Sequence, residues 1–153
     1  MNMKWKWLIG IALLLVVVAG CSEESYEPHE VNAETDICEV CNMSIAHEDY
    51  AAQLIFKNGD YEMFDDVGCL MEFVAGVDES EVGAMFMKDM VGNEWIDVKA
   101  ATFIYSKDYW TPMNYGVLAF KTKEQAEQFM ENEGDGEFLA YDDLKTFKWG
   151  IHH

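Results

Sequence analysis

The order of predicted secondary-structure elements occurs twice along the chain, and this repeat constrains the fold more than any other feature. Each half shows two extended segments, an amphipathic helix and a further extended segment. In the first half, the strands at 51–57 and 60–64 flank Asn58-Gly59, a dipeptide that favours a tight hairpin turn. Hairpins with helices on one face are typical of the α+β class. We therefore predict two tandem ββαβ-like units with mainly antiparallel sheet.

Each unit carries a helix whose start is marked by polar capping residues. Asp65-Asp66 are expected to supply the N-cap and first turn of the first helix, which Gly76 ends. In the second unit, Thr122 and Gln125 match a capping box at the start of the second helix. The remaining strands are expected at 84–89, 95–98, 100–106, 115–120 and 137–141, with a short helix after the last of them.

The first twenty residues have the features of a targeting segment. Lys4 and Lys6 precede an apolar run at 8–19, and small residues stand directly before Cys21. This order is typical of a secretory signal peptide, and the junction resembles a bacterial lipobox, whose cysteine receives acyl chains such as palmitate. We predict a lipoprotein that is anchored through Cys21 at the extracytoplasmic face of the cell membrane. An uncleaved membrane anchor is the alternative.

A polar, acidic segment follows Cys21 and is expected to be a flexible tether. His29 lies in it, and we expect this side chain to be solvated rather than a metal ligand. The predicted regions are a lipoprotein signal peptide at 1–20, a lipidated tether at 21–35, and a folded domain at 36–150 with units at about 36–98 and 99–150.

The chain is strongly acidic, with a formal net charge of -19. Such a charge disfavours nucleic acid and anionic membrane surfaces as binding partners. The sequence contains no Ser-His-Asp arrangement, no Gly-rich phosphate loop and no zinc-hydrolase motif. We therefore predict a protein that is not an enzyme.

The candidate metal ligands are concentrated in a six-residue stretch that contains Cys38, Cys41 and Met43. Thiolate and thioether sulfurs are soft ligands, and soft ligands select Cu(I) over harder ions. Met113 stands before the second strand of the second unit, while Met43 stands before the first strand of the first. If the units pack by pseudo-symmetry, both loops can meet at one edge. His47 is a further candidate because imidazole also binds Cu(I), although it can equally be a surface histidine.

Three other interpretations of the stretch remain open. An exported chain can join Cys38 and Cys41 in a disulfide. A thioredoxin-like redox pair would need a preceding strand and a helix start, which the sequence does not show. A structural zinc site needs four ligands; Cys69 and His47 could complete one, but their spacing is unlike that of common zinc fingers. Cys69 is otherwise expected to be a small buried residue of the first helix.

The chain as a whole resembles the NosL family. The elements that carry the resemblance are the lipobox at Cys21, Cys38-x-x-Cys41-x-Met43, the run Phe64-Asp65-Asp66-Val67-Gly68-Cys69 at a helix start, and Pro112-Met113 ahead of 116–120. Members of this family are outer-surface lipoproteins that accompany nitrous oxide reductase in denitrification. The resemblance implies two ββαβ-type units, which agrees with the repeat described above.

The resemblance also implies a function and a set of ligands. It implies a Cu(I)-binding metallochaperone that supplies copper for the copper–sulfide centre of nitrous oxide reductase, with the reductase, an ABC-type transporter complex, or both as partners. Cys41, Met43 and Met113 match the family's copper-binding positions, and Cys38 matches a less critical cysteine. The alternative is an exported thiol–disulfide oxidoreductase that uses Cys38 and Cys41.

This chain departs from the family pattern at two turns. Asn42 and Asn114 stand where glycine is expected beside the two candidate methionines. Asparagine tolerates left-handed backbone better than most residues with a side chain. We therefore predict that both turns are retained.

Overall fold

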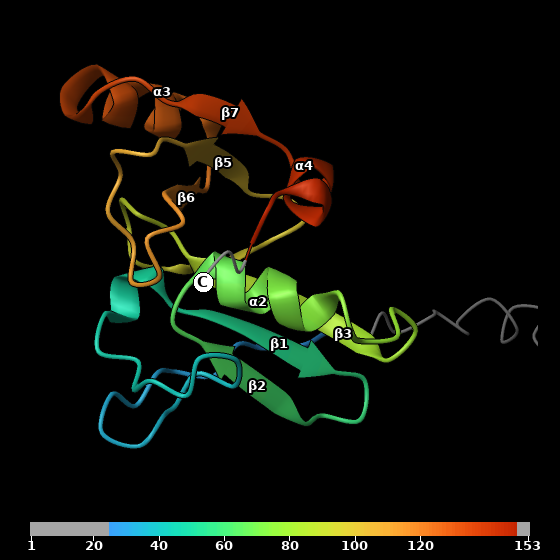
Figure 1. The fold of residues 1–153 in the computed structure, drawn as a ribbon. Helices are drawn as coiled ribbons and strands as arrows, with labels where there is room; N and C mark the ends of the chain where they lie inside the picture. Colours follow the sequence, from blue (N-terminus) through green and yellow to red (C-terminus); the bar gives the residue numbers. More distant parts are fainter. Residues whose placement is uncertain (1–24, 150–153) are drawn as a thin grey trace, which may run out of the picture.

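The computed structural model describes residues 25–149 (Figure 1). The predicted signal peptide, Cys21 and the terminal His152-His153 pair lie outside these residues. Within the described range, no helix combines the length and apolar character needed to cross a membrane.

The first unit forms a four-stranded antiparallel sheet in the order β2-β1-β3-β4. A 3-10 turn, η1, precedes the central strand β1, and the Asn58-Gly59 hairpin joins β1 to β2 as predicted. The elements are η1 (Glu48–Tyr50), β1 (Ala52–Phe56), β2 (Tyr61–Phe64), β3 (Val82–Lys88) and β4 (Trp95–Asp97).

The second unit forms a separate three-stranded antiparallel sheet in the order β6-β5-β7. Its strands are β5 (Thr102–Tyr105), β6 (Val117–Phe120) and β7 (Glu137–Leu139). In both sheets the first strand of the unit lies between the second and the third. This shared topology confirms the predicted α+β class and is consistent with two tandem units.

The helices are α2 (Val67–Val74), α3 (Lys123–Glu133) and α4 (Tyr141–Thr146). Figure 1 shows α2 across one face of the first sheet, with α3 beside the strands of the second unit. Helix α2 contacts β1 and β2 and also reaches β6 of the second unit. The largest hydrophobic cluster accordingly contains side chains from both units, including Leu54, Leu70, Phe103, Val117 and Leu144.

The helix starts are set by the capping residues, with one shift in the first unit. Asp66, in extended backbone, is the N-cap of α2, and its side chain accepts a hydrogen bond from the Gly68 N–H. Asp65 lies one residue before the cap, so the prediction that it begins the helix was wrong by one position. The Thr122–Gln125 capping box of α3 is confirmed.

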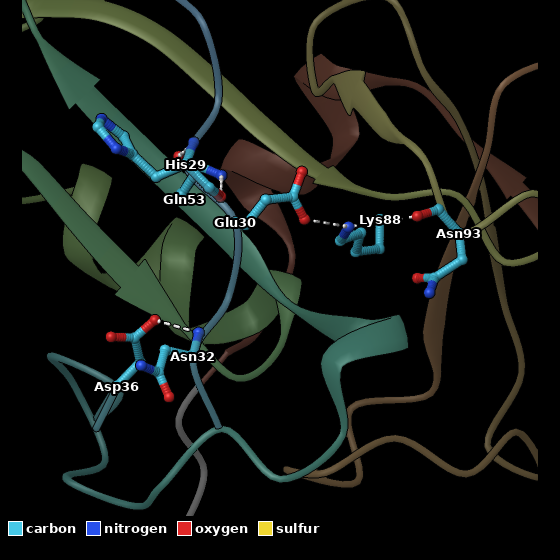
Figure 2. A network of polar contacts seen from close by, with 7 residues as sticks. All are labelled: His29, Glu30, Asn32, Asp36, Gln53, Lys88 and Asn93. Carbon is cyan, nitrogen blue, oxygen red and sulfur yellow. Dashed lines mark hydrogen bonds and ion pairs between the residues drawn. The ribbon is translucent and has the colours of Figure 1, made fainter. Parts of the chain in front are cut away.

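Part of the segment that we expected to be a free tether lies against the first sheet (Figure 2). The fully buried Gln53 side chain exchanges two hydrogen bonds of 2.9 Å with the backbone of His29. The His29 ring, exposed as expected, stacks on Tyr61 with 3.8 Å between ring centroids. Glu30 forms an ion pair with Lys88. These contacts fix the chain to the domain because a buried amide needs hydrogen-bond partners.

The Cys38–Met43 stretch closes into a tight turn. The Cys38 N–H donates to the Met43 carbonyl at 2.8 Å, and the Asn42 N–H donates to the Cys38 carbonyl at 2.9 Å. Asn42 has a φ of 58°, in the left-handed region, and Asn114 has the same value. The prediction that both turns survive with asparagine is confirmed.

Replacement of Asn42 tests this turn. Asn42→Val should destabilise the reduced protein by about 1–2 kcal/mol, because a β-branched residue is strained in left-handed backbone. Asn42→Gly is the matched control and should unfold at the same urea concentration as the parent or at a higher one. Equal midpoints for the two variants would contradict the assigned backbone conformation.

Replacement of Gly68 tests the contact between α2 and the second unit. A Cβ atom at this position would meet the Tyr115 ring and then Trp149. Gly68→Ala should therefore cost about 1–3 kcal/mol of unfolding free energy through overpacking. Gly76→Ala, which meets only a backbone oxygen at 3.6 Å, should change stability by less than about 0.5 kcal/mol. Thermal denaturation distinguishes the two, and a neutral Gly68→Ala would show that the units pack differently.

Candidate metal centre

Four potential metal ligands meet where the Cys38–Met43 turn approaches the start of α2. The sulfurs of Cys38, Cys41 and Cys69 and a carboxylate oxygen of Asp65 all lie within 4.8 Å of one another. In a tetrahedral site with metal–sulfur bonds of about 2.3 Å, two sulfurs are separated by roughly 3.8 Å. Small side-chain movements would therefore bring this cluster, which we call the Cys3Asp cluster, around one ion.

Three segments that are distant in sequence position the cluster. Cys38 and Cys41 lie on the tight turn, which the Glu39 N–H ties to the Met63 carbonyl of β2. Asp65 directly follows β2, and Cys69 lies in the first turn of α2. The cluster thus depends on the turn, the end of β2 and the helix start being packed together.

The Cys3Asp cluster is buried and contains an unpaired oxygen. Cys38 and Cys69 are fully buried, Asp65 is 3% exposed, and Cys41 is partly exposed. The Asp65 Oδ2 atom accepts a hydrogen bond from the Cys41 thiol at 3.4 Å. Its Oδ1 atom has no partner among the described residues. Because an unsatisfied buried oxygen is costly, this atom is a ready ligand for a cation.

The three thiols differ in their readiness to ionise. A hydrogen bond from Cys69 lowers the pKa of the Cys38 thiol to about 7. The same hydrogen bond and burial raise the pKa of Cys69, while burial raises the pKa of Cys41 to about 12. A thiolate on Cys38, stabilised by the Cys69 S–H donor, is therefore the first anionic ligand that the cluster offers.

A surface hollow of about 470 Å³ adjoins the cluster at Asp65. Met43 and His47 line it from the turn side, and Trp110 and Pro112 line it from the second unit. Met43 is 45% exposed. Residues from both units thus border one opening, although Met113 is not among those that line it. The His47 and Trp110 rings pack in an edge-type arrangement, with 4.8 Å between their centroids.

Met113 takes a position beside the cluster but lines a different hollow. Its side chain packs against the hydrophobic cluster that contains Cys38 and Cys69, and its N–H donates to the Asp66 side chain at 3.4 Å. It also borders a hollow of about 720 Å³ with Tyr105. The copper-ligand set Cys41, Met43, Met113, Cys38 and His47 stays a prediction.

Sequence reasoning missed Asp65 as a member of the cluster, and it considered Cys69 as a ligand only in a zinc site that His47 would complete. Cys69 was expected to be a buried apolar residue, and Asp65 to be a helix cap; Cys69 is buried, but both residues also join the Cys3Asp cluster. Their adjacency to the helix start was visible in the sequence. No local pattern, however, linked either residue to Cys38 and Cys41, more than twenty positions earlier.

The structure can be compared with the disulfide, thioredoxin-like and zinc interpretations of the Cys38–Met43 stretch. Cys38, Cys41 and Cys69 are free thiols in this structure. The Cys38-x-x-Cys41 pair lies on a turn rather than at a helix start, which is where a thioredoxin-like pair is found. His47 lies on the surface hollow, whereas Asp65 occupies the fourth place of the cluster.

Comparisons with known proteins identify the family. A search of curated proteins finds no match. The structure is similar to the crystal structure of the copper chaperone NosL from Shewanella denitrificans, with a TM-score of 0.67 and 20% sequence identity over 78% of this chain and 96% of that chain. At this identity, the likeness concerns the fold. The sequence pattern of the NosL family matches residues 28–148, and this chain therefore belongs to the NosL family.

Proposed function

We propose that this protein is a membrane-anchored, extracytoplasmic Cu(I) metallochaperone that supplies copper for the copper–sulfide centre of nitrous oxide reductase. Membership of the NosL family and the similarity to a copper chaperone support copper binding and a role as chaperone. The observation that carries the proposal is the Cys3Asp cluster, with three free thiols next to a hollow lined by Met43. Soft sulfur ligands in this number suit Cu(I).

Copper is the cargo, and the arrangement of the sulfurs suits both its capture and its release. Met43 and the partly exposed Cys41 carry the accessible sulfurs of the site, so they would bind the incoming ion and release it to a partner. A thioether adds no charge and takes up no proton near neutral pH, so Met43 remains a ligand when thiolates are protonated. Cu(I) tolerates a low coordination number. A partner's sulfur can therefore enter before a sulfur of this chain leaves.

The proposed partners are the reductase, its ABC-type maturation transporter complex, or both. The acidic chain would attract a basic surface on the acceptor, and that attraction would weaken as salt is added. Lipidation at Cys21 would confine the chaperone to the membrane that holds such a transporter.

The alternative function is thiol–disulfide exchange by Cys38 and Cys41. Such an enzyme needs an accessible attacking thiolate. Cys38, whose pKa is lowered, is fully buried, while the more exposed Cys41 has a raised pKa. The thiol with the lowered pKa is therefore the one that another protein cannot reach, which favours metal binding over thiol–disulfide exchange.

Replacement of the methionines tests the copper site. In the reduced protein, Met43→Ile combined with Met113→Ile should weaken Cu(I) binding by at least about tenfold, because two soft ligands are lost. Competition with a Cu(I) chelator measures the affinity. Met130→Ile, which changes a methionine packed in a separate cluster, is the control and should bind like the parent. Unchanged Cu(I) affinity in the double variant, together with a disulfide-reductase activity of this chain that Cys38→Ser abolishes, would contradict the copper site. Thiol–disulfide exchange would then be the function.

Delivery is tested in cells that make nitrous oxide reductase. Cys41→Ser should lower the copper content of the purified reductase and the visible absorption of its copper–sulfide centre, because the accessible thiolate is removed. Met130→Ile should leave both at the parental level. A fully loaded reductase in the Cys41→Ser cells, with copper limiting, would show that the chain does not supply this centre.

A further inference from the structure

Residues 26–31, which we call the docked segment, cross the first sheet from one end to the other. The Tyr26 ring lies beside Gly83 near the start of β3, where an added Cβ atom would be 2.7 Å from the ring. Glu30 forms its ion pair with Lys88, the last residue of β3, at 3.8 Å (Figure 2). From Gly83 to Lys88 the strand rises by about 17 Å.

The two ends of the first sheet have different neighbours. Phe64 of β2 and Met87 of β3 lie at one end, where both pair with the first residue of β1. The metal centre lies at this end, because Asp65 directly follows Phe64. Gly83 and the adjoining Tyr26 lie at the other end. The docked segment therefore joins the domain at the end remote from the metal centre.

The docked segment is held by the face of the sheet opposite α2. Leu54 packs in the core cluster that contains α2, so the neighbouring Gln53 points to the other face. There the Gln53 amide exchanges its two hydrogen bonds with the His29 backbone. Val31 packs in a small apolar cluster with the buried Met63 of β2. A paired buried amide and this apolar contact make the segment part of the folded domain.

We propose that the docked segment orients the domain on the membrane, with the Gly83 end of the sheet toward the lipid and the metal opening directed away from it. This inference rests on the anchoring at Cys21 in the proposed function. Only residues 22–25 stand between Cys21 and Tyr26, and five steps along the chain span at most about 18 Å. Without docking, the seventeen steps to Cys38 would span up to about 60 Å and leave the orientation free.

Charge disfavours a domain that lies flat on the lipid. The formal net charge of -19 is repelled by anionic headgroups. A domain that is attached at one end and repelled by the surface stands with its free end away from that surface. The metal opening then stands roughly 15–30 Å above the lipid, from about 14 Å of strand and the short link to Cys21. The fitting acceptor is a basic domain that projects from the membrane, rather than a site within the bilayer.

The experiment uses the lipidated full-length chain, purified from cell membranes and placed in vesicles of phosphatidylcholine and phosphatidylglycerol. A donor dye is attached through an azide-bearing amino acid, which spares the thiols, in place of Glu79 or Ala46. Glu79 is exposed just before β3, and Ala46 is exposed at the hollow beside the metal centre. Energy transfer to a dye-labelled lipid should be more efficient from position 79 than from position 46.

Release of the docked segment should remove this difference. Tyr26→Ala combined with Gln53→Ala deletes the ring beside Gly83 and the amide that holds His29. The difference in transfer should fall by at least about half, and the amides at 26–31 should lose hydrogen-exchange protection. Glu27→Gln, a change at an exposed side chain of the same segment, is the matched control and should retain both.

Two further measurements separate this inference from the proposed function. Intact mass reports the acyl chains on Cys21, and a chain without them would overturn the anchoring and the orientation together. With the acyl chains present, equal transfer from the two positions, or a difference that persists after the segment loses its protection, would overturn the orientation alone. Chelator competition reports Cu(I) binding, and its absence beside a retained transfer difference would refute only the copper function.

Discussion

The hydrogen bonds to the buried Asp66 side chain set the geometry on which the site depends. This carboxylate accepts the Gly68 N–H and so begins α2 directly after β2. It also accepts the Met113 N–H from the second unit. The Asp66 side chain therefore fixes the start of α2, with Asp65 before this cap and Cys69 after it. It also holds the loop that contains Met113 next to the helix start. Burial raises the pKa of Asp66 to about 6, which reflects how far these contacts lie from water.

The site lies at the junction of two units with the same strand topology. Each unit carries an asparagine in left-handed backbone next to a candidate methionine, at Asn42 and Asn114. The surface hollow is bordered by residues of both units, but the Cys3Asp cluster comes from the first alone. The Asn42 turn precedes β1, the first strand of its unit, whereas the Asn114 turn precedes β6, the second strand of its unit, so the pseudo-symmetry describes the strand order rather than the site. The first unit holds the buried donors, and the second contributes Trp110 and Pro112 to the rim of the opening.

Much of the fold could be predicted from the sequence because its signals are local. The Asn58-Gly59 turn, the apolar stripe of α2 and the Thr122–Gln125 capping box each act within a few residues. The site was harder to predict because Cys69 and Asp65 join Cys38 only through packing of distant segments. The docking of His29 on Gln53 was missed for a related reason, since a polar segment can be fixed by a single buried amide.

The central claim is that this junction holds a thiophilic metal through sulfur. X-ray absorption at the copper edge of the reduced full-length chain, loaded with one equivalent of Cu(I), tests this claim most directly. The account predicts a Cu(I) edge and a first shell of sulfur, with no shell dominated by nitrogen or oxygen. A first shell composed mainly of nitrogen and oxygen, or copper that remains with a competing ligand, would contradict it.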